Sequence, residues 1–118
     1  MADGLTANET EQIRDLRSRL NRMPAGPLGE KSVGPLSKGF FDVCARVGLG
    51  PVGDILPGDD LLDAVRGADL AALQGIVGGL QAQRQRDPGR WRAVYMDTGI
   101  LQAVFTRRLV LGGKEHGG

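Results

Sequence analysis

The stretch ADLAALQGIVGGLQAQRQR, residues 68–86, decides the fold class of this chain. Its apolar residues recur at steps of three and four positions, which places their side chains on one face of an α-helix. Asp69 stands at the start, where a carboxylate accepts hydrogen bonds from free backbone amides. The stretch therefore predicts a long core helix. Its expected buried stripe consists of Leu70, Leu73, Ile76, Val77 and Leu80.

Small residues form a second track along the same predicted helix, at Ala71, Gly75 and Gly79. Such a track lets a neighbouring backbone approach closely, although each Gly inside a helix costs about 1 kcal/mol relative to Ala. We expect these three residues to form a contact surface, either within the monomer or with a partner. The last turns, residues 81–86, are polar and basic.

Four further helices are predicted from the residues that can cap their N-termini. They begin at Thr6 (with Glu9 completing a capping box), at Ser37, at Asp59 or Asp60, and at Asp87-Pro88. Residues 24–38 contain the sequence Gly-Pro-Leu twice. Because a residue before proline disfavours helical geometry, we predict a long loop between the first two helices.

The C-terminal part is open to two interpretations. Residues 100–109 have the spacing of a last helix, whereas Val, Phe and Thr in residues 102–111 also favour a strand. Residues 112–118, GGKEHGG, are predicted to be a flexible tail. Residues 1–111 are thus expected to form a single compact all-α domain of five to six helices with Gly/Pro-rich connectors. The alternative is an α+β fold with a short C-terminal strand.

The composition fits one globular domain, since the 118 residues are 41% hydrophobic and 25% charged. The formal net charge is only +1, so no global field would attract the whole protein to nucleic acid or to a membrane. No apolar run approaches the roughly 20 residues of a membrane span. The N-terminal residues lack the pattern of a signal peptide. We expect a cytoplasmic protein without membrane association.

The sequence offers little to an enzyme. The single histidine, His116, lies in the predicted tail, and the single cysteine, Cys44, lies in an apolar stretch. One residue of each kind is too few for a zinc site or for a Cys-His pair. Asp59, Asp60 and Asp63 lack the spacing of a calcium loop and are explained as residues at a helix start. We expect no catalytic activity, no metal site and no cofactor.

Arginines surround Trp91, the only tryptophan. Arginines beside an exposed aromatic ring suit single-stranded nucleic acid, through phosphate contacts and base stacking. The alternative is that Trp91 anchors the core with Val94 and Tyr95, which share its helical spacing, while the arginines lie in water. The nucleic-acid candidates are Arg84, Arg86, Arg90, Trp91, Arg92, Arg107 and Arg108.

Two functions follow as hypotheses. The leading one is a non-catalytic protein-interaction or assembly module, an accessory subunit of a larger complex or a self-associating protein. Its acidic and basic segments would be complementary surfaces, and its interface candidates are Ala71, Gly75, Gly79, Asp59, Asp60 and Asp63. The alternative is an accessory protein that handles or packages single-stranded RNA or DNA through the arginines around Trp91.

Overall fold

The computed structural model describes residues 4–53, 56 and 60–115, and all regular structure in these ranges is helical. The elements are α1 (Ala7–Asn21), η1 (Gly26–Gly29), α2 (Glu30–Arg46), α3 (Leu61–Arg66), α4 (Leu70–Arg86), α5 (Pro88–Trp91), η2 (Arg92–Met96) and α6 (Ile100–Leu111). The all-α prediction is confirmed. Residues 102–110 are helical throughout, so the strand alternative is wrong.

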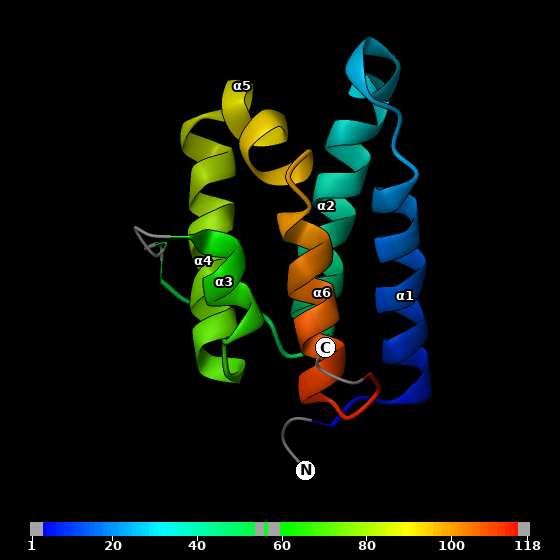
Figure 1. Ribbon diagram of the computed structural model, residues 1–118, viewed down its shortest axis with the longest axis vertical. Coiled ribbons are helices and arrows are strands. Elements are labelled where there is room, and N and C mark those ends of the chain that lie inside the picture. Colours follow the sequence, from blue (N-terminus) through cyan, green and yellow to red (C-terminus); the bar gives the residue numbers. More distant parts are fainter. Residues whose placement is uncertain (1–3, 54–55, 57–59, 116–118) are drawn as a thin grey trace.

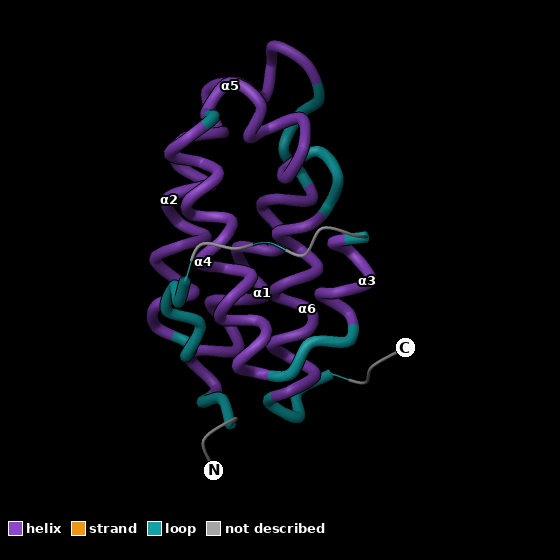
Figure 2. Tube along the Cα trace, turned by 90° about the vertical axis from the view of Figure 1, so that its left-hand side faces the viewer, coloured by secondary structure: helices purple, strands orange, loops and turns teal. Residues whose placement is uncertain are grey.

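Four long helices form an up-down-up-down bundle, in which α1 and α4 run opposite to α2 and α6 (Figure 1). α1 packs against α2 and α6, and α4 packs against the same two helices. The short helix α3 lies against α6 on the outside of the bundle. Figure 2 shows the bundle from the side, with α5 at the end where α2 begins. The radius of gyration is 13.4 Å, close to the value of about 13 Å for a compact domain of this length.

Local caps explain where three of the helices begin. The Thr6 hydroxyl accepts a hydrogen bond from the Glu9 amide (3.1 Å), and the Glu9 carboxylate accepts one from the Thr6 amide (2.9 Å). Asp60 caps α3. Asp69 caps α4 by accepting a hydrogen bond of 2.8 Å from the Ala72 amide. These caps confirm the capping predictions for Thr6, Asp60 and Asp69, because a cap depends on residues only two or three positions apart.

The predicted long loop over residues 24–38 is wrong. The turn η1 begins at Gly26, and α2 begins at Glu30 and continues through Pro35. Two features make this proline tolerable: its ring lies on the exposed face of α2, and Gly34 before it has no Cβ to clash with that ring. Ser37 consequently lies inside α2 and is buried, where it caps nothing.

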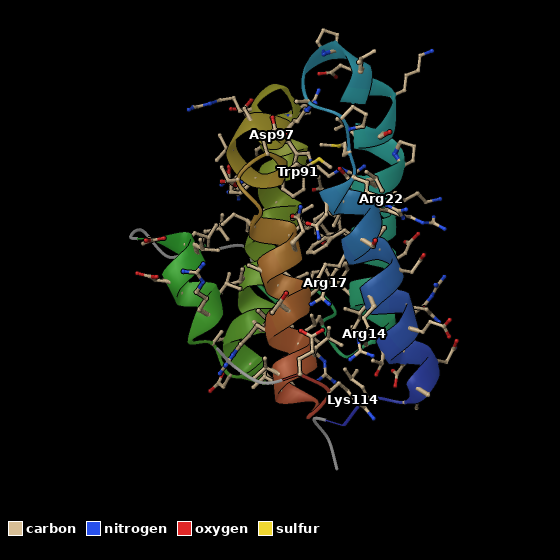
Figure 3. The ribbon with its side chains drawn as sticks, turned by 45° about the vertical axis from the view of Figure 1, so that its right-hand side comes forward. Arg14, Arg17, Arg22, Trp91, Asp97 and Lys114 are labelled. Carbon is tan, nitrogen blue, oxygen red and sulfur yellow. The ribbon has the colours of Figure 1, made fainter. Side chains whose placement is uncertain are left out.

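The predicted tail, as far as residue 115, contacts the first helix. The Arg17 guanidinium donates two hydrogen bonds to the Glu115 carboxylate, at 2.7 and 3.0 Å. Arg14 donates to the Lys114 carbonyl at 3.1 Å. Figure 3 shows Arg14 and Arg17 on α1 on the side that faces the end of α6. Residues 112–115 are therefore held against α1.

Candidate interaction surfaces

Trp91 is a core residue. Its side chain is 2% exposed, and its indole Nε1 donates a hydrogen bond of 2.8 Å to the Ser37 hydroxyl. Its ring lies 5.9 Å from that of Phe41 and 5.2 Å from that of Tyr95, measured between centroids. The ring therefore offers no face to a nucleic-acid base, in contrast to the stacking role proposed from the sequence.

The path of the chain after Trp91 differs from a regular α-helix. The Asp97 amide donates a hydrogen bond of 2.8 Å to the carbonyl of Arg92, five residues earlier in the chain. η2 is therefore one π-helical turn. The wider turn brings Met96 into the core and leaves Val94 38% exposed. The prediction that Val94 and Tyr95 face the core is wrong for Val94, because it assumed the period of an α-helix.

Arg92 holds one end of the bundle together. Its guanidinium donates to the carbonyls of Gly26 (2.7 Å) and Pro24 (2.9 Å) and to the carboxylates of Glu30 (2.9 Å) and Asp97 (3.4 Å). The side chain is only 13% exposed. These bonds link η2 to η1 and to the start of α2, so the Arg92 side chain is committed to the fold.

The two arginines of α6 also point inward. Arg108 is 2% exposed, and its Nε donates to the Val47 carbonyl at 2.7 Å. A cation is favourable there because Val47 ends α2, where the free carbonyls carry partial negative charge. Arg107 donates to the Ala68 carbonyl at 2.7 Å and ties α6 to the turn between α3 and α4.

The remaining arginines of the predicted set lie at the end of α4 and in α5. The Arg84 guanidinium lies 5.8 Å from the centroid of the Phe41 ring, within cation–π range. Arg86 and Arg90 are exposed. The structure thus keeps these three near one end of the bundle and separates them from Arg107 and Arg108.

A backbone approaches α4 closely at Gly78, which lies outside the predicted small-residue track. A Cβ built on Gly78 would lie 2.5 Å from the Val52 carbonyl oxygen and would also meet the Gly53 carbonyl. On the predicted track, Ala71 is exposed and a Cβ on Gly75 would meet nothing within 4 Å. Gly79 is buried.

Gln74 also attaches the connector that follows α2, residues 47–53, to α4. The side-chain amide nitrogen of Gln74 donates to the Gly48 carbonyl at 2.8 Å. The backbone carbonyl of Gln74 accepts from the Val52 amide at 3.4 Å. The connector after α2 is therefore bound along α4 by Gln74 and Gly78, two residues that the sequence pattern did not single out.

The predicted acidic interface residues have local roles. Asp60 is the N-cap of α3, and Asp63 lies 3.9 Å from Arg66 in an exposed ion pair. Such exposed pairs contribute about 0–1 kcal/mol. Asp59 lies outside the described residues. Neither Asp60 nor Asp63 is buried, so both carboxylates remain accessible.

An open apolar groove lies between α3, α4, η2 and α6. It has a volume of about 450 Å³. Its apolar walls are Leu56, Leu61, Leu62, Val94, Tyr95 and Ile100, with Asp60, Gln83 and Thr98 also lining it. Asp60 is the one charged residue among these lining residues. We refer to this feature as the apolar groove.

The titratable side chains of the described residues include one buried thiol. Cys44 is buried, and burial raises the pKa of its thiol well above the usual value. No group of three or more His, Cys, Asp or Glu side chains in residues 4–53, 56 and 60–115 is arranged to hold a metal ion. None of the helices in these ranges has both the length and the hydropathy needed to span a bilayer.

Comparisons with protein-family models, with curated proteins and with solved structures found no match for this chain.

Proposed function

We propose that this protein is a non-catalytic interaction module that binds a protein partner through the apolar groove. The observation that carries the proposal is the exposure of Val94 in a groove whose lining includes five further apolar side chains. Val94 is exposed because the π-helical turn rotates it out of the core. Single π-helical turns inside helical segments occur frequently at functional sites.

The groove suits the insertion of apolar side chains from a partner. A volume of about 450 Å³ falls within the roughly 300–1,000 Å³ of pockets that bind small molecules, so it is large enough for one or two partner side chains. Burying one partner side chain of the size of Leu or Phe contributes about 1.5–3 kcal/mol. Anchors that fill such pockets dominate the affinity of protein interfaces. An accessory subunit docked by a few apolar anchors is the function that this geometry supports best.

A protein partner is favoured over nucleic acid. Asp60, the charged residue of the groove lining, would repel phosphates. Trp91, Arg92 and Arg108 are engaged inside the fold and do not face a ligand. Arg84, Arg86 and Arg90 lie near one end of the bundle, without an exposed aromatic partner from the predicted set.

The test compares Val94→Asp with a matched control, Ala93→Asp. Ala93 is the exposed neighbour of Val94 and does not line the groove. Both variants add one negative charge to the same turn, and thermal unfolding establishes that both fold. Each protein is immobilised and used to capture proteins from its native source, and its own mass in solution is measured by light scattering.

We expect the wild type and Ala93→Asp to capture the same partner, or to form the same oligomer, and Val94→Asp to lose it. If the wild type is a strict monomer that captures nothing, the proposal is wrong. Equal capture by Val94→Asp and Ala93→Asp would also refute it, because a charge in the groove must exclude an apolar anchor. Salt-dependent capture of RNA or DNA instead would support the nucleic-acid hypothesis.

A further inference from the structure

A second groove of different chemistry lies between the end of α1 and the first half of α2. It has a volume of about 380 Å³. Its lining residues are Arg19, Arg22, Met23, Pro24, Lys31, Ser32, Pro35 and Leu36. Three of these residues are cations and none is a carboxylate. We refer to this feature as the basic groove.

The cations of the basic groove are accessible. Arg19 forms an exposed ion pair of 3.1 Å with Asp15, one turn earlier on α1. The Nε of Arg22 makes a long hydrogen bond of 3.4 Å to the Ser18 carbonyl. Lys31 is exposed and takes part in no ion pair or side-chain hydrogen bond among the described residues. Figure 3 shows Arg22 at the end of α1, with its side chain outside the bundle.

The nearest carboxylate of α2 does not neutralise this groove. Glu30 precedes Lys31, but its carboxylate binds the Arg92 guanidinium at 2.9 Å. The Glu30 carboxylate, next to Lys31 in the chain, is therefore paired with Arg92. Asp15 pairs with Arg19, so the excess positive charge of the groove comes from Arg22 and Lys31, in a protein whose net charge is only +1.

The basic groove also has an apolar component. Met23 and Leu36 are part-buried and pack against the core, while Pro24 and Pro35 are exposed. Leu28 is 82% exposed on η1, the turn that connects the two walls of the groove (Figure 1). A ligand that fits this surface needs negative groups together with apolar ones.

We infer that the basic groove binds an acidic peptide segment that carries apolar side chains, as part of the partner recognition proposed above. Charge complementarity selects the acidic segment, because carboxylates form charge-assisted hydrogen bonds with Arg and Lys. The apolar side chains cover Met23 and Leu36. This inference rests on the proposed function and names a second contact of the same partner.

Two other anionic ligands fit less well. A membrane surface is flat, whereas these cations surround a concavity of about 380 Å³. Single-stranded nucleic acid requires aromatic faces for base stacking, and the lining residues include no aromatic side chain. Both ligands are therefore alternatives for the experiment to decide.

The probe is a short fluorescein-labelled peptide of repeated Glu-Glu-Leu units, and its control has Gln in place of every Glu. Fluorescence anisotropy measures binding at about 50 and 300 mM salt, since screening shortens the reach of exposed charges from roughly 14 to 6 Å over this range. The test variant is Arg22→Ala with Lys31→Ala. The control variant is Arg90→Ala with Lys114→Ala, which removes one exposed Arg and one exposed Lys elsewhere.

We expect the Glu peptide to bind the wild type and the control variant with affinities within twofold of each other. The double change at Arg22 and Lys31 should weaken binding about fivefold or more at low salt, since each exposed charge pair contributes a few-fold in affinity. The Gln peptide should bind more weakly than the Glu peptide. The difference between the two peptides should shrink at high salt.

Equal weakening in both double variants would overturn the inference, because net charge rather than the groove would then govern binding. Equal binding of the Glu and Gln peptides would also overturn it. So would tighter binding of anionic phosphatidylserine vesicles or of oligo-dT, if that binding required Arg22 and Lys31. A partner captured through Val94 without any binding of the Glu peptide would refute this inference and leave the proposed function intact.

Discussion

The indole nitrogen of Trp91 and the hydroxyl oxygen of Ser37 lie 2.8 Å apart in the core, so the end of α5 is hydrogen-bonded to the middle of α2. The same hydroxyl lies 2.5 Å from the Val33 carbonyl, to which it donates its proton. Ser37 is fully buried. This hydroxyl therefore joins two segments that are separated by 54 positions in the sequence.

Ser37→Ala should destabilise the protein by about 1–3 kcal/mol, because it leaves the buried Trp91 N–H without an acceptor. Urea unfolding followed by Trp91 fluorescence measures the change. The control is Ser32→Ala, a part-exposed position on the same helix, which should change the free energy of unfolding by no more than about 0.5 kcal/mol. Equal effects at the two positions would contradict the role assigned to Ser37.

Gly78→Ala should lower stability by about 1–3 kcal/mol, because its methyl group overlaps the Val52 and Gly53 carbonyls and forces the connector away from α4. Gly75→Ala should instead raise stability by about 0.5–1 kcal/mol, since Ala has the higher helix propensity and its methyl group meets nothing there. Thermal unfolding of the two variants checks both signs. Stabilisation by Gly78→Ala would mean that the connector does not approach α4 as described.

Arg92→Ala should lower stability by about 1–3 kcal/mol, because it removes the charge-assisted hydrogen bonds of a largely buried guanidinium to Pro24, Gly26 and Glu30. Arg92→Lys should restore only part of this loss, since an ammonium group cannot reproduce the fork of a guanidinium. Arg90→Ala, at an exposed position two residues away, is the matched control. The free energy of unfolding of Arg90→Ala, measured in urea, should stay within about 0.5 kcal/mol of the wild-type value.

The ion pair of Arg17 and Glu115 predicts a pH dependence. The hydrogen bonds that Arg17 donates hold the pKa of Glu115 below its ordinary value of 4.5. A carboxylate with a lower pKa in the folded state stabilises the fold above the unfolded pKa and loses this effect as the pH falls through the folded pKa. Glu115→Gln should therefore reduce stability at pH 7.

The stability difference between the wild type and Glu115→Gln should shrink as the pH falls below about 4.5, when the Glu115 carboxylate becomes protonated. Urea unfolding at neutral and acidic pH measures it. Glu9, on α1, also has a lowered pKa, owing to the backbone and side-chain hydrogen bonds from Thr6, so both proteins should still lose stability in acid. A difference that is constant with pH would exclude an electrostatic role for Glu115.

The starts of α1, α3 and α4 and the core helix could be predicted because their causes are local. The capping bonds of Thr6 and Asp69 connect residues three positions apart. The stripe of Leu73, Ile76, Val77 and Leu80 is buried as its spacing predicts. The apolar groove could be anticipated only in part: Val94 and Tyr95 share the helical spacing of an apolar face, but that spacing did not reveal an open groove.

What the sequence by itself determined is the helical class, the caps and the apolar stripe of α4, since each depends on residues within two turns of one another. The tertiary structure alone decided which polar side chains remain available. Arg92 and Arg108 look like surface cations in the sequence, yet they bind carbonyls 66 and 61 positions away. The Val47 carbonyl is buried at the end of α2 and needs a donor. Only the packed bundle brings either arginine to its carbonyl.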